Sequence, residues 1–137
     1  MKLLMKNKSL YIIAFAITLL ASCTDEDTPT PGGGTTDDRD RYLGDWICTE
    51  SATLSFTINI TKKGTSDTIR IENFGGYGPD EPQAIGLISG NSMTIPFQSI
   101  TLTSINIQGY GVLNGASTKI TMNYVADGNT IAATCTR

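Results

Sequence analysis

Apolar and small polar residues alternate along most of residues 42–137. The segment 54–61 shows this most clearly, with Leu54, Phe56, Ile58 and Ile60 separated by Ser, Thr and Asn. A period of two places successive side chains on opposite faces of an extended strand, which is typical of half-buried β-strands. The apolar positions are largely β-branched or aromatic, which favours strands further. The pattern therefore predicts an all-β domain.

Eight such segments are separated by turn signals. The predicted strands are 45–49, 54–61, 69–72, 84–89, 93–97, 105–113, 120–124 and 131–135. Gly90-Asn91, Asn114-Gly115 and Asp127-Gly128 are typical of tight turns, and short connections favour antiparallel neighbours. Eight strands in a meander can close into a barrel without open edges. We expect a small eight-stranded antiparallel meander barrel. The alternative is an immunoglobulin-like β-sandwich, which needs Greek-key crossings.

Large apolar side chains dominate the face that should point into this barrel. The interior candidates are Trp46, Phe56, Ile58, Ile60, Ile69, Ile71, Met93, Ile95, Phe97, Ile105, Ile107, Ile120, Met122 and Tyr124. An eight-stranded barrel has room for side chains to fill it or for one small ligand. With side chains this bulky on short strands, we expect a filled interior and no small-molecule ligand inside it.

The chain begins with a basic segment that contains Lys2, Lys6 and Lys8, followed by the apolar run 10–20. This order is signal-peptide architecture, and the run is shorter than the ~20 residues that span a bilayer. Leu20-Ala21-Ser22 precedes Cys23. We expect residues 1–22 to be a cleaved leader. The alternatives are an ordinary secretory signal and a retained helix.

The residues around Cys23 resemble the lipobox of bacterial lipoproteins. The resemblance implies that signal peptidase II cuts before Cys23 and that this cysteine is lipidated, for example with palmitate. Asp25, Glu26 and Asp27 resemble the acidic signal that exports Bacteroidetes lipoproteins to the outer face of the outer membrane. The alternative for these acids is simple solvation of a linker.

Residues 24–41 contain Pro, Gly, Thr, acids and two arginines, but no aliphatic or aromatic side chain. Such a segment cannot bury enough apolar surface to offset chain entropy. We therefore predict a lipidated, disordered tether over 23–41, with a reach of about 20–25 Å. One folded domain follows at 42–137.

A resemblance to lipocalins and related calycins begins at Tyr42-Leu43-Gly44-Asp45-Trp46, which looks like their Gly-x-Trp opening. The segments 95–98, 107–115 and 120–124, with Asp127-Gly128 and the late Cys135, are similar to small lipocalin-like lipoproteins of Bacteroidetes, a largely uncharacterised family. The resemblance implies a barrel. In other families such barrels carry small ligands or inhibit external enzymes.

Composition excludes several classes of function. The chain has no histidine, the commonest general base and metal ligand, so no usual triad or zinc site is expected. Without the leader's three lysines, seven basic residues face thirteen acidic ones, so nucleic acid is not an expected partner. We expect a non-enzyme without metal or cofactor.

Cys48 and Cys135 lie on the first and last predicted strands and should both point inward. These strands are neighbours in a closed barrel, and the cell envelope permits disulfides. We therefore expect a Cys48–Cys135 disulfide. The alternative is two separate buried thiols.

The loop 74–82 is the most site-like surface in the sequence, because long loops often carry function. Tyr77 offers a ring, and Asp80 and Glu81 offer charges for sugar hydroxyls or a protein partner. The alternative is a solvated connection with Tyr77 folded over the barrel mouth. We expect a lipid-anchored outer-membrane protein that binds an envelope protein or glycan or has a structural accessory role. It would face the cell surface if Asp25, Glu26 and Asp27 are an export signal. A small-ligand carrier and an inhibitor of an external enzyme are the alternatives.

Overall fold

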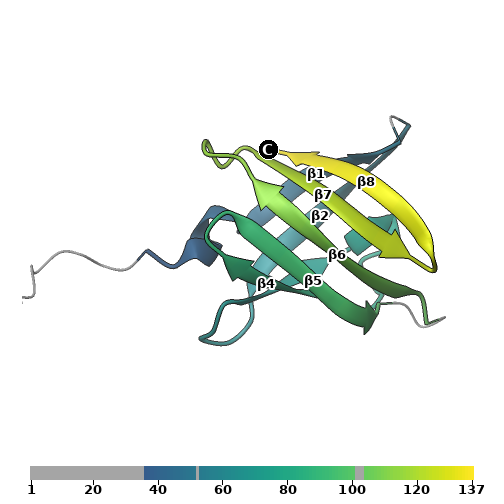
Figure 1. The fold of residues 1–137 in the computed structure, drawn as a ribbon, viewed down its shortest axis with the longest axis horizontal. Helices are drawn as coiled ribbons and strands as arrows, with labels where there is room; N and C mark the ends of the chain where they lie inside the picture. Colours follow the sequence, from purple (N-terminus) through teal and green to yellow (C-terminus); the bar gives the residue numbers. More distant parts are fainter. Residues whose placement is uncertain (1–35, 52, 101–103) are drawn as a thin grey trace, which may run out of the picture. The chain divides into compact units, whose positions relative to one another are not determined.

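The computed structural model describes residues 36–137 except 52 and 101–103, and within them the predicted fold is confirmed. Eight antiparallel strands follow one another around a closed barrel in sequence order, and β8 pairs with β1 (Figure 1). The sandwich alternative is therefore wrong. The strands are β1 (Gly44–Glu50), β2 (Leu54–Lys62), β3 (Thr68–Glu72), β4 (Ala84–Ser89), β5 (Ser92–Ser99), β6 (Asn106–Leu113), β7 (Lys119–Ala126) and β8 (Asn129–Thr136).

The predicted leader, Cys23 and the predicted tether up to residue 35 lie outside the described residues. Among the residues that are described, no helix is long and apolar enough to cross a membrane.

The predicted tether is wrong over its last residues, because Asp38–Arg41 form a short 3-10 helix, η1. Arg39 is only 6 % exposed. Its guanidinium binds Asp37 at 2.6 Å and donates to the carbonyl oxygens of Gly64 and Thr68 at 3.1 and 3.2 Å. Hydrogen bonds from the Arg39 side chain to the Asp37 carboxylate, followed by those from Lys62, hold the pKa of Asp37 well below its usual range. The charges that suggested a solvated linker instead attach this segment to the β2–β3 turn.

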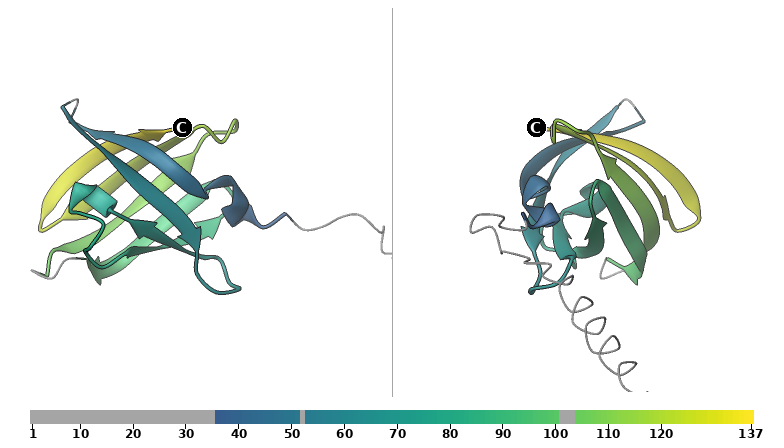
Figure 2. Two further views of the ribbon diagram at one scale, coloured as in Figure 1. Left: turned by 180° about the vertical axis from the view of Figure 1, so that it is seen from behind. Right: turned by 60° about the vertical axis from the view of Figure 1, so that its left-hand side comes forward.

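The side chain of Trp46 is fully buried, which confirms its predicted place in the core. Its Nε1 donates to the carbonyl oxygen of Tyr42 at 2.7 Å, and the Arg137 guanidinium lies 4.3 Å from its ring centroid. Arg137 also donates to the carbonyl oxygens of Leu43 and Arg41, at 2.7 and 2.9 Å. Trp46 on β1 and Arg137 therefore hold the C-terminal end of η1 in place at one end of the barrel (Figure 2).

Most of the predicted interior residues are confirmed, but the prediction for Phe97 is wrong, because its side chain is 70 % exposed. The other candidates are buried, apart from Phe56 and Ile105, which are partly buried against the core. A β-bulge explains the exception, because the β5–β6 register shifts between Ile95 and Gln98. An extra residue in one strand turns the following side chains to the opposite face. Phe97 therefore points outward.

Side chains pack so closely around two interior glycines that a methyl group at either one would have to push a neighbouring side chain aside. A Cβ at Gly111 would lie 2.7 Å from Cε of Met93, and one at Gly86 would lie 3.0 Å from Cγ1 of Ile69. Both glycines face the core rather than a turn. This packing fits the expectation of a filled barrel.

Cys48 and Cys135 are direct partners in the β1–β8 ladder, and both are fully buried. Their sulfur atoms are paired in disulfide geometry. Because the ladder brings the two residues together, a covalent link at this point joins the strands that close the barrel.

Two buried tyrosines should make stability fall at high pH. Burial raises the pKa of Tyr42 to about 12, and burial followed by a hydrogen bond to Glu50 raises that of Tyr124 well above its usual range. Both groups titrate near pH 10 when unfolded, so above that pH the unfolded chain holds fewer protons than the folded one. Stability should then fall by about 1.4 kcal/mol per pH unit for each tyrosine until its folded pKa is passed.

The measurement is guanidinium unfolding between pH 8 and 12, with tyrosinate absorbance recorded on the same samples. The tyrosinate of these two residues should form only as the protein unfolds. An unfolding free energy that stays constant from pH 10 to 12 would contradict the burial of both hydroxyl groups.

Candidate functional site

The loop singled out by the sequence is held against one end of the barrel. It begins with the 3-10 helix η2 (Phe74–Gly76), which follows Asn73. The Asn73 side chain donates to the carbonyl oxygen of Thr57 and accepts from the N–H of Gly78, both at 2.8 Å. The first hydrogen bond ties Asn73 to β2, and the second holds Gly78 to Asn73 within the loop.

Tyr77 is 37 % exposed, and its ring lies against the backbone of η2, where a Cβ on Gly75 would meet Cε2 of Tyr77 at 2.7 Å. Burial raises its pKa, and the negative charges of Glu50 and Asp127 raise it further. Asp80 is solvent-exposed and Glu81 is partly buried. The ring is thus placed at the barrel end, and the proposed use of Tyr77, Asp80 and Glu81 as one binding loop stays a prediction.

A polar pair that the sequence reading did not single out lies at the same end. Glu50 is only 7 % exposed, and its carboxylate accepts a hydrogen bond from the Tyr124 hydroxyl. The Phe74 ring packs edge-on against Tyr124, with centroids 4.8 Å apart. The sequence could have indicated this pair, because Glu50 is an acid at the next inward-facing position after Trp46 and Cys48. Because the carboxylate is already paired with the hydroxyl, we assign this cluster a role in fixing η2 to the barrel.

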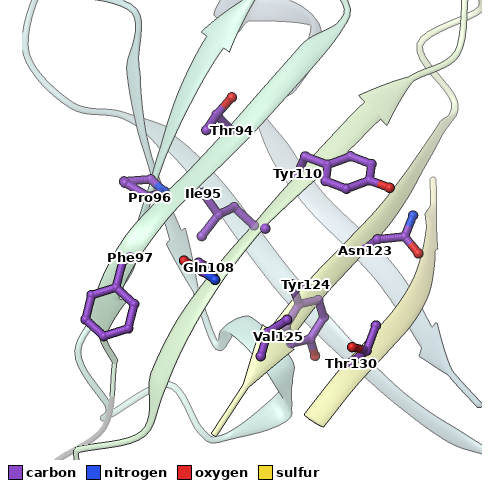
Figure 3. Close-up of a pocket in the computed structure, with 11 residues that line it drawn as sticks. Thr94, Ile95, Pro96, Phe97, Gln108, Tyr110, Asn123, Tyr124, Val125 and Thr130 are labelled. Atoms are coloured by element: carbon purple, nitrogen blue, oxygen red, sulfur yellow. The ribbon is translucent and has the colours of Figure 1, made fainter. Parts of the chain in front are cut away.

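A groove on the outside of the barrel is the more site-like feature. It has a volume of about 580 Å³ and crosses β5, β6 and β7 to the start of β8 (Figure 3). We call it the outer groove. It is lined by Thr94, Ile95, Pro96, Phe97, Gln108, Gly109, Tyr110, Asn123, Tyr124, Val125 and Thr130.

The strand register explains how these side chains meet. Thr94 on β5, Tyr110 on β6 and Asn123 on β7 are successive partners in one row across the sheet. In the next row, Gln108 pairs with Val125, which pairs with Thr130. The bulge places Phe97 beside Gln108, as Figure 3 shows. The groove thus depends on the same register shift that turned Phe97 outward.

Gly109 brings β6 and β7 unusually close beneath the groove. A Cβ there would lie 2.5 Å from the carbonyl oxygen of Asn123 and 2.6 Å from Cα of Tyr124. Those are backbone atoms, which cannot turn aside as a flexible side chain does. A glycine in a strand often marks such a close approach of two backbones.

The chemistry of the outer groove combines exposed rings with neutral hydrogen-bonding groups. Phe97 and Tyr110 are 70 % and 57 % exposed. No charged residue lines the groove, and the amides of Gln108 and Asn123 have no hydrogen-bond partner within the described part of the chain. Such a surface can hold an uncharged molecule by ring contacts and amide hydrogen bonds.

Two other surface hollows have different linings. One, of about 420 Å³, lies beside η1 and includes Asp37 and Arg39, which are already engaged in ion pairs. Another, of about 540 Å³, is lined only by Thr, Ser and Ala on β1, β7, β8 and the β1–β2 connection. Neither has an exposed ring. Within 36–51, 53–100 and 104–137, no group of three acidic or cysteine side chains is placed to hold a metal ion.

Sequence reasoning missed the outer groove because it assigned Phe97 to the interior and did not single out Tyr110. Pro96 could have indicated the outward position of Phe97, since proline within a strand is largely confined to edges and bulges. In a closed barrel without edges, it points to a bulge, and a bulge reverses the facing of the next residue.

Comparison with known proteins gives no family to set beside this geometry. No family model matches the chain, and no curated protein matches its sequence. The resemblances to lipocalins and to Bacteroidetes lipoproteins therefore stay expectations drawn from the sequence.

Proposed function

We propose that this protein is a lipid-anchored, non-catalytic binding module of the cell envelope that binds through the outer groove. Cys23 carries the lipid, the segment after it is the tether, and the barrel presents its outer face at the outer membrane. The observation that carries the binding role is the pair of exposed rings, Phe97 and Tyr110, across a neutral groove. Large exposed apolar side chains gathered at one place are typical of interaction sites.

The packing of the interior favours this surface role over that of a carrier. A carrier needs an apolar cavity, and small-molecule sites usually have about 300 Å³ or more. At Gly111 and Gly86 even one added methyl group would have to displace the side chain of Met93 or Ile69. The barrel thus acts as a rigid support, and its outer side chains make the contacts.

The anchor is tested by metabolic labelling with an alkyne fatty acid in a bacterial host that processes lipoproteins. The wild-type chain should take up the label and sediment with membranes, whereas Cys23→Ser should do neither. Label on the Cys23→Ser variant, or unlabelled wild type, would refute the anchor.

The binding surface is tested by NMR shift mapping on the full chain in a polyoxyethylene detergent, with methyl glucoside, phenol and hexanol as probes. Backbone amides of residues 94, 95, 97, 108–110 and 123–125 should shift, while the buried methyl groups of Ile58, Met93 and Met122 should not. Shifts confined to those buried methyl groups would instead support a carrier and overturn the surface role.

A further inference from the structure

We propose that the ligand of the outer groove is an uncharged polysaccharide chain, with Phe97 and Tyr110 as stacking platforms. This inference rests on the proposed binding function and adds the chemical class of the ligand. Three observations carry it: the two rings, the free amides between and beside them, and the absence of charge from the lining.

The rings provide flat apolar faces that are separated from each other. Phe97 lies beside Gln108, and Tyr110 is the next outward residue on β6, so the rings stand diagonally across neighbouring strands. Figure 3 shows them on opposite sides of Gln108. Sugar rings have C–H faces that pack on aromatic rings, and different sugars of one chain can contact the two platforms. Aromatic side chains supply this contact at low entropic cost, since each has two torsions.

The amides supply the polar half of the recognition. Gln108 lies between the rings, and Asn123 is the direct partner of Tyr110 on β7. Each amide offers an acceptor oxygen and two N–H donors. Neighbouring sugar hydroxyls can donate to the oxygen and accept from the nitrogen of one such group. The hydroxyls of Thr94 and Thr130 add further partners at the two sides of the groove.

The missing charges argue against other classes of ligand. No carboxylate lines the groove to bind a cation, and no Lys or Arg lines it to bind phosphate, sulfate or uronic acid groups. The chain itself is acidic, which disfavours anionic ligands further. A protein partner would need a larger surface with a continuous apolar centre. Here a polar amide separates the two rings, and the groove is open along the sheet, which suits a chain molecule.

The test is affinity electrophoresis of the full chain in a polyoxyethylene detergent. The gels contain neutral glucan, mannan, xylan or arabinogalactan, or the anionic polymers polygalacturonate and dextran sulfate. At least one neutral polysaccharide should retard the protein, and the anionic ones should not. Phe97→Ala and Tyr110→Ala should each lower the affinity derived from the retardation about tenfold or more, which corresponds to ~1.4 kcal/mol. Gln108→Ala should weaken it as well.

Ile47→Ala and Leu54→Ala are matched controls, because they remove an exposed apolar side chain of β1 or β2, outside the groove. Both should bind as the wild type does. Retardation by only the anionic polymers, or neutral retardation that survives the Phe97→Ala/Tyr110→Ala double variant, would overturn the proposal. So would a dimer, seen by sedimentation, that dissociates in the double variant, because a second copy would then cover the groove.

Failure of this inference can be told apart from failure of the binding function. If no neutral polysaccharide retards the protein but phenol or hexanol still shifts the backbone amides of residues 94, 95, 97 and 108–110, the ligand class is wrong and the binding surface stands. If neither experiment gives a signal in the groove, both proposals fail.

Discussion

Breaking the Cys48–Cys135 link should lower the free energy of unfolding by about 4 to 5 kcal/mol, because the bond closes most of the domain into one loop. The two cysteines are 87 residues apart in sequence. Without the bond, the unfolded chain gains the conformational freedom of that long loop, while the folded barrel retains the β1–β8 ladder. We expect Cys48→Ala/Cys135→Ala to keep its β-sheet circular dichroism and to unfold at much lower denaturant concentration.

The measurement is guanidinium unfolding of the wild type, oxidised and reduced, beside the double variant. The reduced wild type and the variant should unfold at similar concentrations. Alkylation followed by mass measurement gives the control: two additional thiols should react only after reduction. Two thiols of these residues that react in unfolded, unreduced protein would show that the pair is not bonded.

Gly109→Ala should cost about 3 kcal/mol or more, at or above the usual range for overpacking in a core. The added methyl group would meet the backbone of β7 at 2.5 and 2.6 Å, so two strands must separate to admit it. The positive φ that strains many substituted glycines does not apply here, since Gly109 is not among the positive-φ glycines. The cost therefore comes from steric overlap alone.

Gly115→Ala is the matched control, since a Cβ there meets no atom within 4 Å and Gly115 also lacks a positive φ. Its unfolding free energy should stay within about 0.5 kcal/mol of the wild type, as is usual for surface changes. Equal stability of the two variants in denaturant unfolding would contradict the close approach of β6 and β7.

The barrel was predictable from the sequence because its signals are local. Alternation in 54–61 and turn pairs such as Gly90-Asn91 act over a few residues, and short turns between most neighbouring strands leave a meander as the simplest arrangement. Closure placed Cys48 opposite Cys135 without further information. The ends of the domain were harder. The charged residues of η1 suggested a solvated linker, because Arg39 binds Gly64 and Thr68, which are distant from it in sequence.

The outer groove was not predictable to the same extent. It needs the register of three strand pairs, and one bulge at Pro96 and Phe97 changes which side chains face outward. Alternation alone assigns Phe97 to the interior. The length of the loop with Tyr77 suggested a site, but a hydrogen bond from the Asn73 side chain to Thr57 holds the loop to β2. A site formed from outward side chains of regular strands has no loop or motif to mark it in the sequence.

The most direct test of binding through the outer face is the affinity of Phe97→Ala/Tyr110→Ala for the probes that shift the groove amides, measured by NMR titration of the full chain. The two side chains are exposed, so their loss should leave the unfolding free energy within about 0.5 kcal/mol of the wild type. We predict that the affinity falls at least about tenfold while stability is kept. Unchanged affinity in this stable double variant would contradict the account.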